Sequence, residues 1–177
     1  MRKHTRGRSG SWLFATTLFF VVGRSVCAAA DVPLTKKFNC PGDACTISTP
    51  SDWRLRDDSK NELAIEAGDE TYTTIWTEPK EDFVKMDLDT LAKKRVDEMS
   101  KKLAGPTVGP GKQVVVGKQK GLQFEVGGGI DNYNISYLYT ILEGEKNYFR
   151  VLQWTLKSKY PAKRPLYEQV LQSFEGR

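Results

Sequence analysis

Histidine and cysteine are scarce in this chain of 177 residues, which has one histidine at position 4 and cysteines at positions 27, 40 and 45. Long apolar runs are missing as well. The longest, residues 12–23, is shorter than the roughly 20 residues that a membrane-spanning helix needs. With no histidine beyond position 4, the rest of the chain can build neither a Ser-His-Asp triad nor a Cys-His pair.

Residues 1–30 have the composition of a secretory signal peptide. A basic start with no acidic residue precedes the apolar run, and three alanines end the segment. We expect cleavage between Ala30 and Asp31. A twin-arginine signal is disfavoured because no two arginines are adjacent, and Arg24 makes lipid attachment at Cys27 unfavourable. Retention of the segment as an anchor is the remaining alternative.

The basic character of the chain comes from this leader. The chain has 27 Lys and Arg against 22 Asp and Glu, and five of the basic residues lie at positions 2, 3, 6, 8 and 24. Residues 31–177 therefore carry 22 charges of each sign. Nucleic-acid-binding domains have an excess of positive charge. We expect no nucleic-acid partner, and an exported, periplasmic or secreted protein without a stable membrane span after cleavage.

Cys40 and Cys45 are the cysteines that remain after cleavage, in an oxidising compartment. A thioredoxin-type centre has two intervening residues, whereas this pair has four. A zinc site needs four ligands, of which two cysteines supply half. The pair is predicted to form a disulfide that fastens the N-terminal arm to the first strand. No metal or cofactor is expected.

Hydrophobic periodicity predicts strands, a long helix, more strands and a final helix. The long helix covers residues 87–103, with Asp87 as its N-cap and Gly105-Pro106 as its stop. Pro165 is expected to open the final helix. The last three strands should form an antiparallel meander, and residues 135–142 are apolar on both faces. The predicted strands are residues 45–50, 62–68, 71–78, 113–117, 121–130, 134–142 and 147–156.

This order predicts an α+β fold, a mainly antiparallel sheet flanked by helices. The domain division is a leader at 1–30, an N-terminal arm at 31–44 and one domain at 45–177. The segments ISTPSDW, DLDTLAKKRVDEMSKKL and YEQVLQSFEG resemble the PsbP-like fold. That α/β/α sandwich is shared by the photosystem II protein PsbP, a yeast nuclear-transport factor that binds Ran, and DcrB-type bacterial exported proteins. The resemblance implies an accessory or binding role and brings no catalytic motif.

Carboxylates are the main candidates for catalysis after cleavage. Their adjacent pairs, at positions 57–58, 69–70, 81–82 and 87/89, fall in predicted turns or helix starts. Acids at such places usually cap helices and face solvent. A carboxylate-based hydrolase is therefore the weaker alternative to a non-catalytic protein. A structural envelope protein without a discrete ligand is the other.

Gly127, Gly128 and Gly129 lie inside a predicted strand, where glycine marks a bulge or a close backbone approach. The gap is either a packing contact or a binding groove. We expect the groove, with Tyr72, Trp76 and Tyr133 as its walls. Two helices also leave room for an uncovered aromatic patch on the sheet.

The long helix is rich in basic residues: Lys93, Lys94, Arg95, Lys101 and Lys102. These side chains form either a solvated face or a docking patch for anionic lipid or an acidic partner, with at most weak contact to an anionic surface. The favoured function is an exported, non-catalytic accessory or binding protein of the cell envelope, docking a protein or a small apolar ligand.

Overall fold

The computed structural model describes residues 31–57 and 62–177. The expected leader lies outside these residues. The described chain has two α-helices, two short 3₁₀ helices and eleven strands. In chain order they are β1 Lys36–Asn39, η1 Pro41–Asp43, β2 Cys45–Thr49, β3 Arg54–Leu55, β4 Leu63–Ala67, β5 Thr71–Pro79, η2 Lys80–Phe83, α1 Leu88–Ser100, β6 Ala104–Val108, β7 Lys112–Val116, β8 Gln119–Ile130, β9 Tyr133–Glu143, β10 Asn147–Leu156, α2 Tyr160–Gln172 and β11 Glu175–Gly176.

The strands form two sheets. The main sheet has the order β3-β4-β5-β10-β9-β8-β6, with β7 also paired to β8, and the small sheet has the order β1-β2-β11. Every strand pairing in both sheets is antiparallel. The predicted α+β class is confirmed, as is the meander of β8, β9 and β10.

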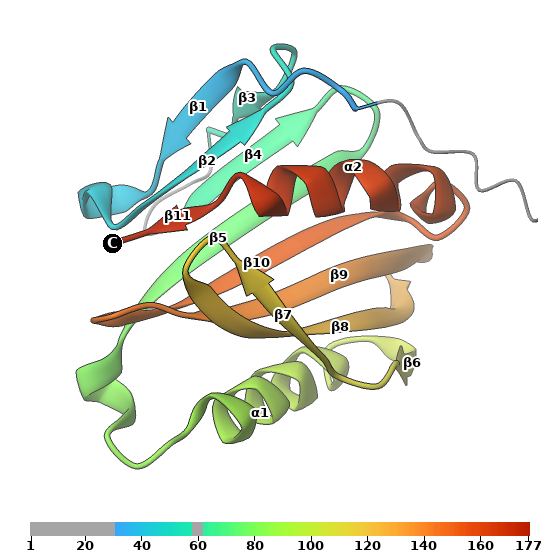
Figure 1. Cartoon of the computed structure of the whole chain (residues 1–177). Coiled ribbons are helices and arrows are strands. Elements are labelled where there is room, and N and C mark those ends of the chain that lie inside the picture. Colours follow the sequence, from blue (N-terminus) through green and yellow to red (C-terminus); the bar gives the residue numbers. More distant parts are fainter. Residues whose placement is uncertain (1–30, 58–61) are drawn as a thin grey trace, which may run out of the picture.

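The layers form a sandwich around the main sheet (Figure 1). One face packs against α2 and the small sheet, and the other packs against α1. Leu138 of β9 belongs to the α2-side core, whereas its neighbours Tyr137 and Tyr139 belong to the α1-side core. Successive side chains of a strand point to opposite faces. This explains why the sequence of β9 is apolar throughout.

Helix α1 forms where the sequence predicts it. The Asp87 carboxylate accepts a 2.7 Å hydrogen bond from the Thr90 backbone N–H, which fixes the N-cap. Leu91, Ala92 and Val96 are buried against the sheet. The helix ends at Ser100, three residues before the predicted end.

Several element boundaries differ from the predictions. Residues 36–39 of the expected arm form a strand, and residues 104–108 form β6 instead of a loop. Helix α2 begins at Tyr160, so Pro165 lies inside it. The earlier start buries the Tyr160 ring beside Tyr167, with ring centroids 6.4 Å apart. Tertiary packing thus extends the helix ahead of the proline that local propensity selects.

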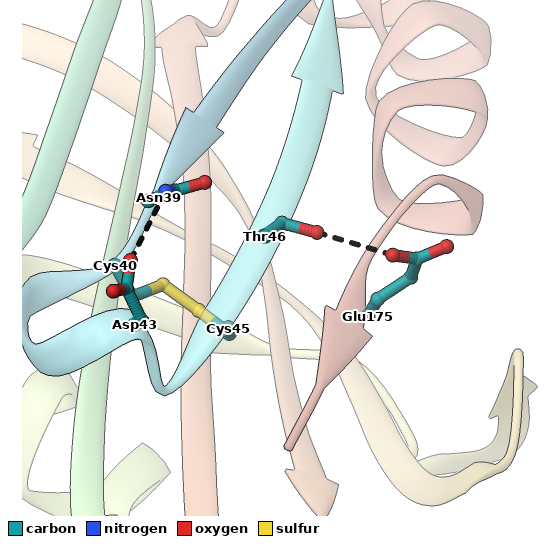
Figure 2. Close-up of a disulfide and its surroundings, with 6 residues drawn as sticks. All are labelled: Asn39, Cys40, Asp43, Cys45, Thr46 and Glu175. Atoms are coloured by element: carbon teal, nitrogen blue, oxygen red, sulfur yellow. Dashed lines mark hydrogen bonds between the residues drawn. A yellow bond between two sulfur atoms is a disulfide. The ribbon is translucent and has the colours of Figure 1, made fainter.

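The predicted disulfide is confirmed (Figure 2). Cys40 and Cys45 are bonded across η1, with their Cα atoms 5.1 Å apart, which is within the usual range. The Cys40 backbone N–H donates to the Cys45 carbonyl at 2.8 Å, and the Asn39 amide donates to Asp43 at 3.0 Å. The disulfide closes the β1–β2 hairpin of the small sheet.

Within the described residues, neither helix combines the length and apolarity needed to cross a bilayer.

Candidate functional site

The two faces of the central strands differ in how well they are covered. On the α2 side, Ile65, Ile75 and Val151 are completely buried. On the α1 side, the alternate residues of the same strands, such as Trp76 and Leu152, are only half-buried. The difference arises because α1 lies mainly over β6, β8 and β9, and the surface of β5 and β10 extends beyond it. Part of a sheet face is therefore open.

We call this open surface the aromatic face. Its residues come from three adjacent strands and are Tyr72, Trp76, Tyr137, Leu152, Trp154 and Leu156. The strand register sets Tyr72 opposite Trp154, and Trp154 opposite Tyr137. Tyr137 is buried, at 7% exposed, and the other five side chains are half-buried. Half-buried apolar side chains on one contiguous surface are typical of interaction sites.

The rings of the aromatic face are held in fixed positions. Tyr72 stacks on Trp154 with centroids 5.0 Å apart and planes inclined by 18°, and Tyr137 lies 6.3 Å from Trp154. The Arg56 guanidinium is 5.6 Å from the centre of the Tyr72 ring. Such contacts each add modest stability. The contacts within the chain thus preorganise this surface for binding.

A groove of about 230 Å³ runs between α1 and the aromatic face. Met99 and Leu103 form its apolar wall, and Tyr137 and Leu152 lie on its floor. The other lining residues are Trp76, Arg95, Glu98, Lys102, Ile130, Tyr139 and Arg150. Burial raises the pKa of both Tyr137 and Tyr139. Their hydroxyls therefore stay protonated at neutral pH, and the floor offers neutral rings.

An ion-pair cluster lies beside the groove and includes three of its lining residues, Arg95, Glu98 and Arg150. Glu78 is only 8% exposed, and its carboxylate lies 2.8 Å from Arg95 Nη2 and 2.7 Å from Arg150 Nε. The contact with Arg150 is an ion pair without the alignment of a hydrogen bond. Arg95 also donates to Glu98 at 2.8 Å, and this bond lowers the pKa of Glu98. The Arg150 guanidinium sits 4.6 Å from the Trp76 ring centre. Both arginines are therefore neutralised by acids of this chain.

Lys102 is the remaining charge on the groove lining. Among the residues that the structure describes, it has no ion-pair partner. Its side chain is exposed at the C-terminal end of α1. The groove lining thus has neutralised charges at Arg95, Glu98 and Arg150 and one cationic position at Lys102.

The predicted groove at the three glycines was wrong. Gly127 and Gly129 pair with Thr107 and Ala104 of β6. A Cβ on Gly128 would lie 2.7 Å from the Leu103 Cβ. The glycines are therefore a packing contact that lets the end of α1 and the start of β6 approach the sheet. The sequence could not show this, because it gave no sign of β6.

The three residues predicted to form the groove walls do not all lie together in the structure. Trp76 lines the groove and Tyr72 lies on the aromatic face, but β10 and β9 separate their strand from the glycines. Tyr133 is 60% exposed at the start of β9. Tyr137, Leu152, Met99 and Leu103 were not predicted as site residues from the sequence. The alternation in β10, where Leu152, Trp154 and Leu156 share one face, was the signal available.

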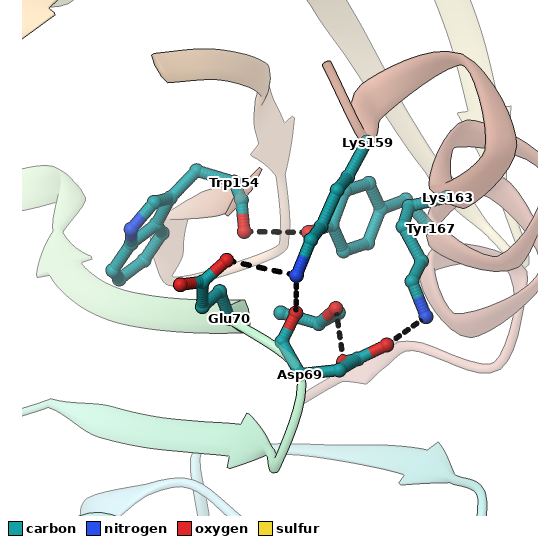
Figure 3. A network of polar contacts seen from close by, with 7 residues as sticks. Asp69, Glu70, Trp154, Lys159, Lys163 and Tyr167 are labelled. Atoms are coloured by element: carbon teal, nitrogen blue, oxygen red, sulfur yellow. Dashed lines mark hydrogen bonds and ion pairs between the residues drawn. The ribbon is translucent and has the colours of Figure 1, made fainter. Parts of the chain in front are cut away.

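The adjacent acids Asp69 and Glu70 have a structural role on the α2 side of the sheet (Figure 3). Glu70 forms an ion pair with Lys159 at 2.8 Å, and Asp69 forms one with Lys163. Burial opposes ionisation, but hydrogen bonds from Lys163 and Thr71 hold the pKa of Asp69 below its ordinary value. These contacts join the β4–β5 turn to the start of α2. Groups of three or more metal-binding side chains are absent from the described residues.

Comparison with family models gives no match for this chain, and comparison with curated protein sequences gives no significant one. Solved structures do match. PsbP from the cyanobacterium Synechocystis sp. PCC 6803 aligns with a TM-score of 0.58 at 14% identity, over 85% of this chain and 97% of PsbP. The Ran-binding protein Mog1p of Saccharomyces cerevisiae gives 0.54 at 10%, over 81% and 96%. The chain has the Mog1p/PsbP-like fold.

Two further structures share the Mog1p/PsbP-like fold. LpqN of Mycobacterium tuberculosis, described as involved in cell envelope biogenesis, gives a TM-score of 0.52 at 14% identity, over 73% of this chain and 81% of LpqN. A Bacteroides thetaiotaomicron protein gives 0.58 at 15%, over 82% of this chain, and the chain spans about half of that protein's length (49%). Identities this low establish the fold alone. The resemblance stated from the sequence is confirmed at that level.

Proposed function

We propose that this chain is an exported, non-catalytic accessory protein of the cell envelope that binds a partner at its aromatic face. The observation that supports this most is the unequal cover of β5 and β10. Ile75 and Val151 on the α2 side are completely buried, while Tyr72, Trp76 and Trp154 on the other face remain half-buried beside a groove. Leaving large apolar side chains in water is unfavourable, so such a surface is best explained by a partner.

The composition of residues 1–30 and the Cys40–Cys45 disulfide support export. The fold is shared with LpqN, which is described as involved in cell envelope biogenesis, and with PsbP. An envelope location agrees with the description of LpqN.

The acidic residues support a non-catalytic role. Asp69 and Glu70 hold α2, Asp87 caps α1 and Glu78 is bound by two arginines. A carboxylate-based hydrolase would need two acids facing a substrate cleft, one of them with a raised pKa. In the groove, Glu98 instead has its pKa lowered by Arg95.

The test compares two charge insertions. Leu152→Glu places a carboxylate on the groove floor, and Val115→Glu places one on β7, where the side chain is already 64% exposed. The wild type and both variants are compared for the proteins that they capture and for their binding of an apolar dye. We expect Leu152→Glu to abolish this binding and Val115→Glu to leave it unchanged. Circular dichroism and melting curves check that both variants fold. Unchanged capture by a folded Leu152→Glu protein would refute this function.

A further inference from the structure

We propose that the aromatic face receives an amphipathic α-helix of a partner protein, which lies beside α1 and directs an acidic side chain toward Lys102. This inference rests on the proposed function, because it names the chemistry of the partner at the same site.

The strands of the floor offer no backbone hydrogen bonds. β5 lies between β4 and β10, and β10 lies between β5 and β9, so both strands are paired on both edges. An extended segment lying on this face would bury its own N–H and C=O groups against side chains, which is costly. A helix satisfies its backbone internally. The floor therefore favours a helix over an added strand.

The dimensions of the aromatic face also match a helix. From Arg150 to Leu156 the β10 strand advances six residues, which is about 20 Å at 3.3 Å per residue. Thirteen helical residues cover about 20 Å at 1.5 Å each, and α1 itself has 13 residues. Helices pack about 8–10 Å apart, close to two strand spacings. A second helix of the size of α1 would thus fit over β10 and β5.

The charges that line the groove favour acidic residues on the side of the partner helix that faces α1. Arg95 and Arg150 are occupied by Glu78 and Glu98, whereas Lys102 has no ion-pair partner in the described part of the chain. A helix with Leu, Met or aromatic residues toward Leu152 and Trp154 and a Glu or Asp at its edge would complement this arrangement. A basic edge would instead face Lys102 with like charge.

Tryptophan makes the site directly observable by NMR. The described residues contain Trp53, Trp76 and Trp154. Trp76 and Trp154 lie in the site, whereas Trp53 is 1% exposed in the core of the other face. In ¹⁵N-labelled protein produced from the full-length chain, Trp→Phe variants assign the indole signals. Trp53 then serves as the internal control.

The probes are three designed peptides of about 14 residues with the same apolar positions. One has a glutamate edge, the second has lysines at the same positions, and the third keeps the glutamates but carries a central proline that breaks the helix. Dodecyl maltoside micelles test a lipid-like occupant. We expect the acidic helix to shift Trp76 and Trp154 but not Trp53, with a Kd at least tenfold lower than that of the proline peptide.

A matched pair of variants tests the charge step. Lys102→Glu should reverse the preference, weakening the acidic peptide by twofold to tenfold and strengthening the basic one. Lys93→Glu makes the same change at an exposed position of α1 that does not line the groove. It should leave both affinities unchanged.

The outcomes separate the two proposals. Equal binding of all three peptides at Trp76 and Trp154 would support the aromatic face as a binding site but refute an acidic helix as its partner. Shifts caused by micelles and not by peptides would identify a lipid-like occupant and overturn it too. Concentration-dependent shifts without any probe would identify a second copy of the chain as the occupant. Failure of Leu152→Glu to change capture, as described above, would remove the proposed function itself.

Discussion

Gly128→Ala, compared with Gly129→Ala, is the sharpest test of how the end of α1 packs on the sheet. A Cβ at position 128 would lie 2.7 Å from the Leu103 Cβ, 3.1 Å from its Cδ1 and 3.3 Å from the Ala104 carbonyl oxygen. Leu103 is 9% exposed and joined to both α1 and β6, so it cannot move freely. A Cβ at position 129 would meet only ordinary contacts, the nearest at 3.5 Å.

We expect Gly128→Ala to lower the free energy of unfolding by about 1–3 kcal/mol, as overpacking in a close-packed region does. The melting temperature should fall by about 2–12 °C, at about 2–4 °C per kcal/mol for a domain near this size. Gly129→Ala should be neutral or stabilising by up to about 1 kcal/mol, because alanine restricts the unfolded chain. Thermal and urea unfolding measure both variants.

The reasoning would be refuted if Gly128→Ala were as stable as the wild type, or if Gly129→Ala were equally harmful. The first result would mean that a gap exists beside Gly128, as predicted from the sequence. The second would mean that the cost at these positions does not come from the contact with Leu103.

Three further predictions concern processing, the disulfide and pH. The intact mass of the exported protein should correspond to a chain that begins at Asp31, and a species that retains the leader would contradict cleavage. Changing Cys40 and Cys45 together to serine should cost about 2 kcal/mol by loop entropy and lower the melting temperature by several degrees, whereas an unchanged value would exclude a stabilising disulfide. The pKa of Asp69 is lowered in the folded state, so its stabilisation is present above about pH 4 and is lost as the pH falls further. Asp69→Asn should therefore melt earlier than the wild type at pH 7 but show a smaller difference near pH 3, and an equal deficit at both pH values would refute the linkage to Lys163.

The sequence predicted the strongly periodic elements well. Helix α1 and strands β5, β8, β9 and β10 all lie where apolar spacing and turn residues place them. These elements are long, and their own residues carry the signal. The Asp87 cap and the cysteine pair were equally local, since each depends on residues a few positions apart.

The short elements could not be predicted because distant segments stabilise them. β11 has two residues, and it forms because Glu175 and Gly176 pair with Thr46 and Cys45, far away in the chain. β6 contains Gly105 and Pro106, which locally favour a loop, yet it pairs with β8 at the glycines. Tertiary pairing overrides local propensity in both strands.

The candidate site depends on how much of the sheet α1 covers. The alternation of apolar and polar residues along a strand does not reveal this width. The main sheet aligns seven strands in a row, roughly 29 Å at about 4.8 Å between neighbours. A single helix is about 10–12 Å wide, so α1 can cover less than half of its face. The opposite face is covered by both α2 and the small sheet, and Ile75 and Val151 on that side of the same strands are completely buried. Large aromatic side chains such as those of β5 and β10 are usually buried, yet residues 31–57 and 62–177 supply one α-helix, α1, on their side of the sheet. Because α1 does not cover these side chains, we infer that a partner protein covers them.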